Sequence, residues 1–293
     1  MSCPICGSDK TFITYSGKIR TGVPGCMTET VETVFKCENC AVIWHRNIVE
    51  SDTLYQTDTY RESVGEVVSL EEFYAKHDTA ILDKLKYTGT AAYRNKICMD
   101  IGCGGGGYAD YIRGVASKML LVEPCENYSI QLRAKGYEVF SYAEDALAAH
   151  ANKVDVITSF DVIEHVENPL LFLQTIQKLL APNGVAYIGT PTEYPVLRSL
   201  LGTVFDSFVF CVPHPWVFSK KSLELLAEKS GFTDSSVHSY QRFGIGNLIA
   251  WLQTNTPKGE ATFDFVTSAL NACYMSEMAR EETAEYFVLE LKK

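Results

Sequence analysis

The sequence predicts an α/β protein built on a mostly parallel sheet, with a small cysteine-rich module before it. From Lys96 onward, short apolar runs alternate with amphipathic helical stretches, a pattern typical of strands joined by right-handed crossover helices. The first fifty residues instead hold two CxxC pairs, which indicate a metal-stabilised module. We therefore expect a zinc-ribbon-like module at 1–50, a helical connector at 51–93 and the α/β domain at 94–293.

Composition narrows the class of protein. The 293 residues are 46% hydrophobic and 21% charged, which suits a soluble chain with a full core. No apolar run reaches the ~18 residues that span a bilayer, and the first residues lack the basic and apolar regions of a signal peptide. We expect no membrane span and a cytoplasmic location. The net charge of -10 repels phosphate backbones and predicts no nucleic-acid partner.

The module is defined by Cys3, Cys6, Cys37 and Cys40, with a glycine-containing, hairpin-like stretch between the two pairs. This spacing lets four thiolates surround one tetrahedral zinc ion. A closed four-sulfur site has no open position, so we expect the zinc to be structural. A redox dithiol is the alternative, but it does not explain two pairs. We expect His45 to be a surface residue and not a ligand.

The expected elements follow in chain order. In the connector, apolar residues recur at three- and four-residue spacing over 69–87 and predict a helix. Strands are expected at 96–102, 118–123, 137–142, 154–160, 184–190, 235–241 and 285–291, the last two forming an antiparallel hairpin. Helices are expected at 108–115, 127–135, 169–180, 219–231, 246–252 and 265–275.

A glycine-rich turn follows the first strand of the α/β domain. Its sequence, DIGCGGGG, begins at Asp100 and leads into a helix, and Glu123 ends the next strand. Glycine lets the backbone approach a ligand closely, and a carboxylate at that strand end can accept both hydroxyl protons of a ribose. Such a turn also serves dinucleotides or simple packing. An acidic Asp100, however, suits the cationic amino-acid end of S-adenosylmethionine (AdoMet), which has no phosphate.

The motifs DIGCGGG, VEP, SFDVIEHVENP and LAPNGVAYIGTP together resemble the motif series of class I methyltransferases over residues 96–240. The resemblance implies a Rossmann-like sheet of seven strands and AdoMet as cofactor. It implies the following cofactor-binding residues: Asp100, Gly102, Gly104 and Gly106 at the methionine end with neighbouring Cys103, Glu123 at the ribose with neighbouring Pro124, Ala143 and Glu144 beside the adenine, and Phe160 and Asp161 closing the site.

Glu164 and His165 follow the fourth strand of the domain, at the sheet edge where such folds bind ligands. The methyl group on a sulfonium is already activated, so a hydroxyl acceptor needs mainly alignment and a base. His165 is the candidate base, with Glu164 beside it as a second catalytic candidate. Two alternatives stay open: the pair braces a loop, or, as in the quinone-pathway enzymes that the segment resembles, it lies near a divalent ion.

A long aromatic insert, residues 192–218, separates the fifth strand from the next helix. It exceeds a plain connection, and we expect it to form part of the acceptor pocket or a lid. For His214 within it we favour a structural role. Further on, Arg242 has two interpretations: it clamps an acceptor phosphate or carboxylate with paired hydrogen bonds, or it forms a buried ion pair.

The zinc ribbon, the methyltransferase core and the segment QRFGIGNLIAWL together resemble bacterial enzymes that methylate sugars and other precursors of surface polysaccharides and natural products. The chain lacks the extra large domain of sugar C-methyltransferases with a similar module, so O-methylation of a sugar nucleotide or related precursor is favoured. An RNA base methyltransferase and a non-catalytic AdoMet-binding protein are the alternatives. The sequence leaves the oligomeric state open, a homodimer included.

Overall fold

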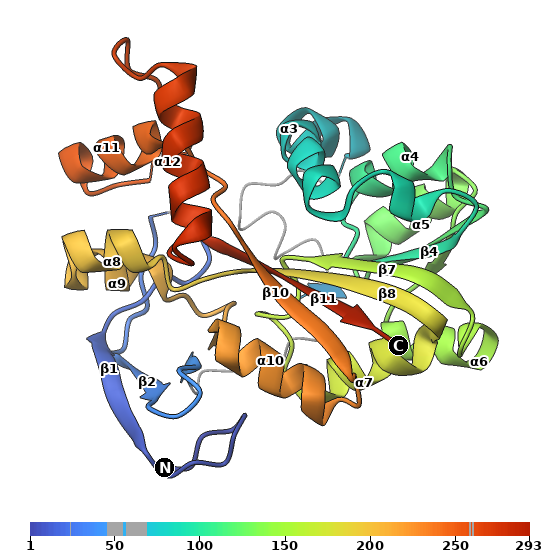
Figure 1. The fold of residues 1–293 in the computed structure, drawn as a ribbon, viewed down its shortest axis with the longest axis horizontal. Helices are drawn as coiled ribbons and strands as arrows, with labels where there is room; N and C mark the ends of the chain where they lie inside the picture. Colours follow the sequence, from blue (N-terminus) through green and yellow to red (C-terminus); the bar gives the residue numbers. More distant parts are fainter. Residues whose placement is uncertain (24, 46–54, 57–68, 258, 260) are drawn as a thin grey trace.

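The computed structural model describes residues 1–293 except 24, 46–54, 57–68, 258 and 260. Its largest element is a seven-stranded sheet flanked by helices (Figure 1). The strands are β4 (Ile97–Ile101), β5 (Lys118–Val122), β6 (Glu138–Phe140), β7 (Val154–Phe160), β8 (Leu180–Pro191), β10 (Asp234–Tyr240) and β11 (Tyr286–Lys292).

The strand order is β10-β11-β8-β7-β4-β5-β6. The five strands from β8 to β6 run parallel to their neighbours, whereas β11 lies antiparallel to both β8 and β10. The sequence prediction of a mostly parallel seven-stranded sheet with a C-terminal antiparallel hairpin is therefore confirmed.

Every expected helix is present, with short additional ones. They are α3 (Leu70–Thr88), α4 (Gly107–Arg113), α5 (Glu126–Ala134), α6 (Leu147–His150), α7 (Pro169–Leu179), α8 (Pro195–Leu201), α9 (Thr203–Val209), α10 (Lys220–Lys229), α11 (Ile245–Thr254) and α12 (Ser268–Arg280), with the 3-10 turns η1 (Ala91–Tyr93) and η2 (Ala143–Ala146). Helix α3 begins where the Ser69 side chain accepts a hydrogen bond from the Glu72 amide, an N-cap that satisfies an otherwise unpaired donor.

The sheet buries both faces because successive side chains of a strand point to opposite sides. In β4, Met99 lies in the core that packs against α7 and α10, while neighbouring Cys98 lies in the core beneath α3, α4 and α5. A strand that is buried on both faces is apolar along most of its length. This double burial explains why the central strands were recognisable as continuous apolar runs.

The cysteine module contains β1 (Thr11–Gly17), β2 (Glu32–Cys37) and β3 (Ile43–His45). Strands β1 and β2 form the expected hairpin. The fourth strand of this sheet, β9 (Trp216–Val217), comes from the aromatic insert and pairs with β3. The division of the chain at residue 50 stays a prediction, and strand pairing crosses it.

The expectation that His45 is a surface residue was wrong, because only 3% of it is exposed. The insert returns to the module and covers β3, a tertiary contact that local sequence does not reveal. Of the predicted connector at 51–93, residues 51–54 and 57–68 lie outside the described residues, and α3 forms most of the rest.

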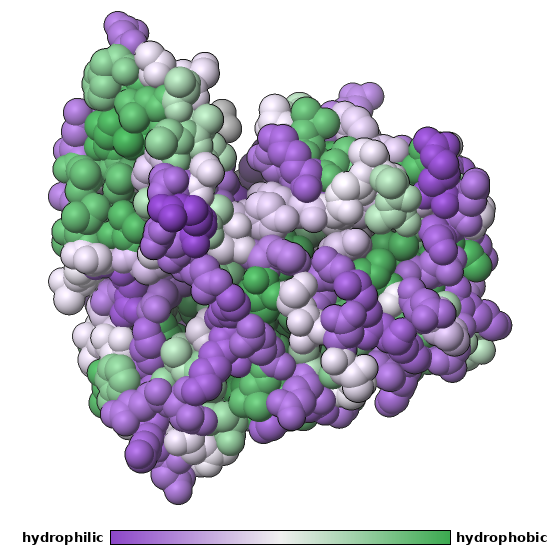
Figure 2. Space-filling model, viewed as in Figure 1, coloured by the Kyte–Doolittle hydropathy of each residue, from purple (hydrophilic) through white to green (hydrophobic). Residues whose placement is uncertain are grey.

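Figure 2 shows an apolar surface over α11 and α12. Helix α11 contains the exposed side chain of Leu252, and α12 contains that of Leu270. Among the helices that the structure describes, none has the length and apolarity needed to cross a bilayer.

Candidate functional site

The glycine turn joins β4 to α4 and lies beside the end of β7. Gly102, Gly104 and Gly106 have φ angles of 74°, 55° and 77°, a left-handed conformation that favours glycine. Space adds a second requirement, since a Cβ on Gly102 would lie 2.3 Å from Cγ2 of Val162. The turn is therefore restricted to glycine by both conformation and packing.

Glu123 follows β5, the parallel neighbour of β4, and its side chain points back to this turn. One carboxylate oxygen accepts a 2.8 Å hydrogen bond from the Gly104 amide and the other a 2.9 Å bond from the Cys125 amide. The residue is only 1% exposed. The structure thus brings Glu123 and the glycine turn together as expected, while its ribose-binding role stays a prediction.

Asp100 lies at the end of β4 and is 4% exposed. The Thr158 hydroxyl donates a 2.7 Å hydrogen bond to its carboxylate. Burial raises the pKa of Asp100 to about 6, against the opposing effect of nearby Lys84. A cavity beside it is also lined by Gly102, Cys103 and Phe160. Four of the predicted cofactor-binding residues therefore share one cavity.

Lys84, which was not among the residues expected from the sequence, lines the same cavity from α3. Its ammonium lies 5.3 Å from the centre of the Phe160 ring. Lys84 and Asp100 place opposite charges in one cavity, an arrangement suited to a zwitterionic amino acid. No motif points to Lys84, because α3 reaches the turn only through tertiary packing: a Cβ on Gly104 would lie 2.9 Å from the Phe73 ring.

The two residues expected beside the adenine, Ala143 and Glu144, do not line the cavity that contains Asp100. Ala143 is buried in the core, and Glu144 accepts a 3.0 Å hydrogen bond from the Thr175 hydroxyl on α7. The described residues that line the cavity include neither of these two residues, and they do not include Pro124. Their contacts with a cofactor stay predictions.

Glu164, His165 and His214 form a second cluster, in which one potential ligand atom from each residue lies within 4.8 Å of the others. The two imidazole rings are perpendicular, with centres 4.4 Å apart. Nδ1 of His165 lies 2.8 Å from the Pro213 carbonyl oxygen and 2.8 Å from the Tyr55 hydroxyl. A proton on Nδ1 that donates to Pro213 leaves the lone pair on Nε2.

The electrostatics of this cluster favour neutral groups. Glu164 is 1% exposed, accepts a 3.0 Å hydrogen bond from Thr190, and has its other oxygen unpaired among the described residues. Burial, followed by the charge of Asp161, raises the pKa of Glu164 to about 8. Burial and neighbouring His165 lower the pKa of His214 well below its usual value. One carboxyl and two imidazoles also make a donor set that fits a divalent cation.

Arg242 forms an ion pair, which was one of the two interpretations of this residue from the sequence. Its guanidinium lies 3.3 Å from the Asp161 carboxylate and donates a 2.9 Å hydrogen bond to the Tyr194 hydroxyl. It also lies 4.3 Å from the centre of the Tyr286 ring. Arg242 thereby links the ends of β7 and β10 to the start of α8. A role as an acceptor clamp stays a prediction.

The four module cysteines lie within 4.8 Å of one another. The Sγ atoms of Cys3 and Cys40 are 3.6 Å apart, and those of Cys6 and Cys37 are 3.5 Å apart. Four sulfurs at ~2.3 Å from a tetrahedral zinc ion are separated by about 3.8 Å. These two separations are therefore close to those of a zinc site, and all four sulfurs lie within reach of one ion.

A family model described as a methyltransferase domain matches residues 73–237, more than half of the chain. The match includes the glycine turn, Glu123 and the Glu164–His165 pair, and it ends before Arg242.

Curated relatives share part of this region. A ubiquinone biosynthesis O-methyltransferase of Actinobacillus pleuropneumoniae is 30% identical over 122 residues, covering 37% of this chain and 51% of the relative. One from Caulobacter vibrioides is 32% identical over 153 residues, covering 48% and 60%. The mitochondrial enzyme of Rattus norvegicus is 29% identical over 156 residues, covering 47% and 45%. The chain thus spans about half the length of these relatives.

Two solved structures have the same fold. One is a SAM-dependent methyltransferase from Thermotoga maritima, named as a candidate histamine N-methyltransferase, with a TM-score of 0.51 and 19% identity over 76% of this chain and 94% of that one. The other, a SAM-dependent methyltransferase from Archaeoglobus fulgidus, has a TM-score of 0.51 and 16% identity over 80% and 98%. At these identities the likeness concerns the fold alone.

Proposed function

The chain belongs to the methyltransferase domain family, and on this premise we propose that it transfers the methyl group of AdoMet to a hydroxyl group of a small molecule. The observation that carries the proposal is the glycine turn held by Glu123, with Asp100 and Lys84 in the adjoining cavity. These groups match the ribose and the zwitterionic amino acid of AdoMet.

AdoMet supplies an activated methyl group when bound. Asp100 would hold its ammonium, Lys84 would pair with its carboxylate, and Glu123 would accept hydrogen bonds from the ribose hydroxyls. These three contacts would fix the donor, and Phe160, at the end of β7, would help to exclude water from the cavity. Alignment of the donor is the main requirement of an in-line displacement.

His165 removes the proton of the acceptor hydroxyl. The Pro213 carbonyl accepts the Nδ1 hydrogen at 2.8 Å, which leaves Nε2 as the proton acceptor and stabilises the imidazolium that forms. Buried Glu164, whose pKa is raised to about 8, adds no full negative charge at neutral pH. It therefore supports a neutral His165 before reaction.

For the acceptor, the relatives named ubiquinone biosynthesis O-methyltransferases support methylation at oxygen. They give no support to the sugar nucleotide or glycan precursor that the sequence favoured. We therefore propose screening labelled AdoMet against sugar nucleotides and hydroxylated precursors of ubiquinone together. Methyl transfer to neither class, with RNA methylated instead, would contradict the proposed acceptor.

We further propose that the four cysteines bind one structural zinc ion. The clustering of their four sulfurs within 4.8 Å supports this role, and so does the small size of the sheet that they adjoin.

Replacing Glu123 with alanine should weaken AdoMet binding more than tenfold, because charged hydrogen bonds of ~1.5–3 kcal/mol each are lost. The dissociation constant from calorimetry measures the effect. Glu126→Ala, an exposed change at the start of α5, is the matched control. An unchanged dissociation constant in Glu123→Ala would refute the ribose assignment.

AdoMet binding should weaken as the pH falls below 6. The pKa of Asp100 is about 6 in the free protein, so its carboxylate is ionised above this pH and protonated below it. A cationic amino group prefers the ionised form, and the affinity should drop about tenfold between pH 7 and pH 5. Calorimetry across this range tests the effect; Asp100→Asn should bind weakly but without the pH dependence. A constant wild-type affinity would exclude Asp100 as the partner.

A further inference from the structure

The loop between α9 and β9, residues 210–215, lies between the cysteine module and the His165 cluster. On the module side, Nε2 of His45 lies 3.0 Å from the Cys211 carbonyl oxygen and 3.1 Å from that of His214. The His45 amide also donates a 3.2 Å hydrogen bond to the Pro215 carbonyl. One residue of the module thus holds three carbonyl groups of the loop.

Burial lowers the pKa of His45, which favours the neutral ring at neutral pH. Its Nδ1 is buried and has no partner among the described residues, which places the single ring proton on Nε2. That proton is shared between two carbonyl oxygens. The hydrogen bonds of the His45 side chain to described residues therefore all go to the loop.

Other contacts of the module hold the same loop. The Arg20 amide donates a 3.2 Å hydrogen bond to the Phe210 carbonyl, and the Val212 amide donates a 2.8 Å bond to the Arg20 carbonyl. A Cβ on Gly22 would lie only 2.8 Å from Cγ of Pro213. The loop therefore lies against the module at both ends and in the middle.

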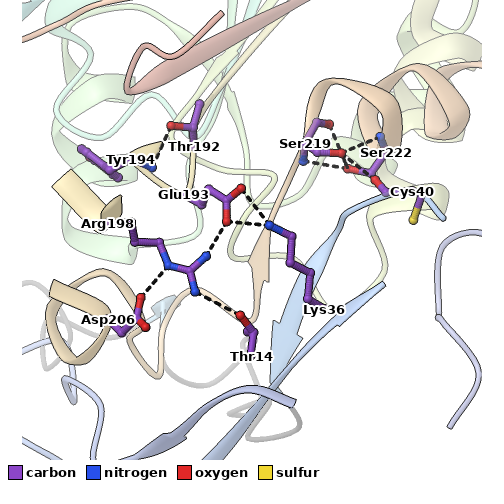
Figure 3. Close-up of polar contacts among 10 residues, drawn as sticks. All are labelled: Thr14, Lys36, Cys40, Thr192, Glu193, Tyr194, Arg198, Asp206, Ser219 and Ser222. Atoms are coloured by element: carbon purple, nitrogen blue, oxygen red, sulfur yellow. Dashed lines mark hydrogen bonds and ion pairs between the residues drawn. The ribbon is translucent and has the colours of Figure 1, made fainter. Parts of the chain in front are cut away.

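The wider insert is tied to the module by charge. In Figure 3, Lys36 of β2 and Arg198 of α8 both reach the Glu193 carboxylate, and Arg198 also bonds Asp206 at 2.5 Å and Thr14 at 3.1 Å. These side chains are only partly exposed, so the network is stronger than a typical surface pair.

On its other side, the loop forms part of the proposed acceptor site. The Pro213 carbonyl accepts the Nδ1 hydrogen of His165, and the His214 ring lies against that of His165. We infer that the cysteine module positions the acceptor half of the active site, with His45 as the positioning residue. This inference rests on the proposed function. The module then does more than stabilise the fold. By positioning the Pro213 carbonyl, it determines which ring nitrogen of His165 carries the proton.

The test compares the full-length wild type with His45→Met, which keeps a side chain of similar size but removes the donor. His45→Gln can restore a donor near Nε2. Lys229→Met is the matched control, since Lys229 contacts the module at the Ile5 carbonyl, away from the loop. The measurements are hydrogen exchange of residues 210–217, nitrogen-15 NMR of His165, and calorimetric affinity for S-adenosylhomocysteine.

In His45→Met we expect exchange in the loop to accelerate about tenfold or more and the His165 Nδ1–H signature to disappear, while the affinity for S-adenosylhomocysteine stays within twofold. His45→Gln should recover both loop signals, and Lys229→Met should leave all three measurements unchanged. If His45→Met does not fold, Gly22→Ala, which presses on Pro213 from the module side, should produce the same two changes.

An unaltered loop and His165 signature in His45→Met would overturn the inference, and so would equal effects in Lys229→Met. If the wild type methylates no hydroxyl acceptor, the proposed function fails by itself. The exchange and NMR measurements would still decide whether the module positions the loop. Where turnover is found, His45→Met should lower kcat and leave KM for AdoMet unchanged.

Discussion

Replacing His165 with alanine is expected to lower kcat about 100-fold or more and to leave AdoMet affinity within twofold. A positioned general base contributes ~10²–10⁴-fold to such reactions, whereas the cofactor contacts lie at the ends of β4 and β5. Turnover of labelled AdoMet and calorimetry measure the two quantities. His238→Ala, which removes a half-exposed imidazole on β10, is the matched control.

Wild-type turnover in His165→Ala would remove this residue as the base. Metal analysis of the same samples separates the alternatives that the sequence left open. A second divalent ion in the wild type that is lost in both His165→Ala and His214→Ala would assign the cluster to metal binding in place of proton transfer. One donor atom each of Glu164, His165 and His214 lies within 4.8 Å of the others, so a single ion could contact all three residues.

Removal of zinc is expected to have the largest effect on stability. Wild-type protein should contain about one zinc ion per chain, following the four-ligand rule. Because a small module depends on its metal, chelation or Cys40→Ser should lower Tm by on the order of 10 °C. Elemental analysis and calorimetry measure these changes.

Cys26→Ser is the matched control for Cys40→Ser, because Cys26 is an exposed thiol of the same module outside the cluster. It should keep both the zinc and the wild-type Tm. A metal-free protein of full stability would contradict the structural role of the cluster.

Local patterns were sufficient to predict the large sheet. Strands such as β4 and β7 are buried on both faces and are therefore mostly apolar, and each of these two strands is followed by a helix, α4 or α7, that the sequence predicted. The glycine turn and Glu123 were also predictable, because parallel neighbouring strands place their carboxyl ends at one edge. The structure confirms that the Glu123 carboxylate contacts this turn.

Residues brought in by tertiary packing were not predictable. Lys84 reaches the cavity only because α3 packs over the glycine turn, and His45 is buried only because β9 returns to pair with β3. A two-residue strand such as β9 has no periodicity to detect. The contact between His165 and His214 likewise depends on the path of a long insert.

A crystal structure with S-adenosylhomocysteine tests the proposed cofactor site most directly. We expect the nucleoside to lie against the glycine turn, with its ribose hydroxyls on Glu123 and its amino acid between Asp100 and Lys84. A structure at saturating ligand with the nucleoside bound elsewhere, or with no density for it, would contradict this cofactor site.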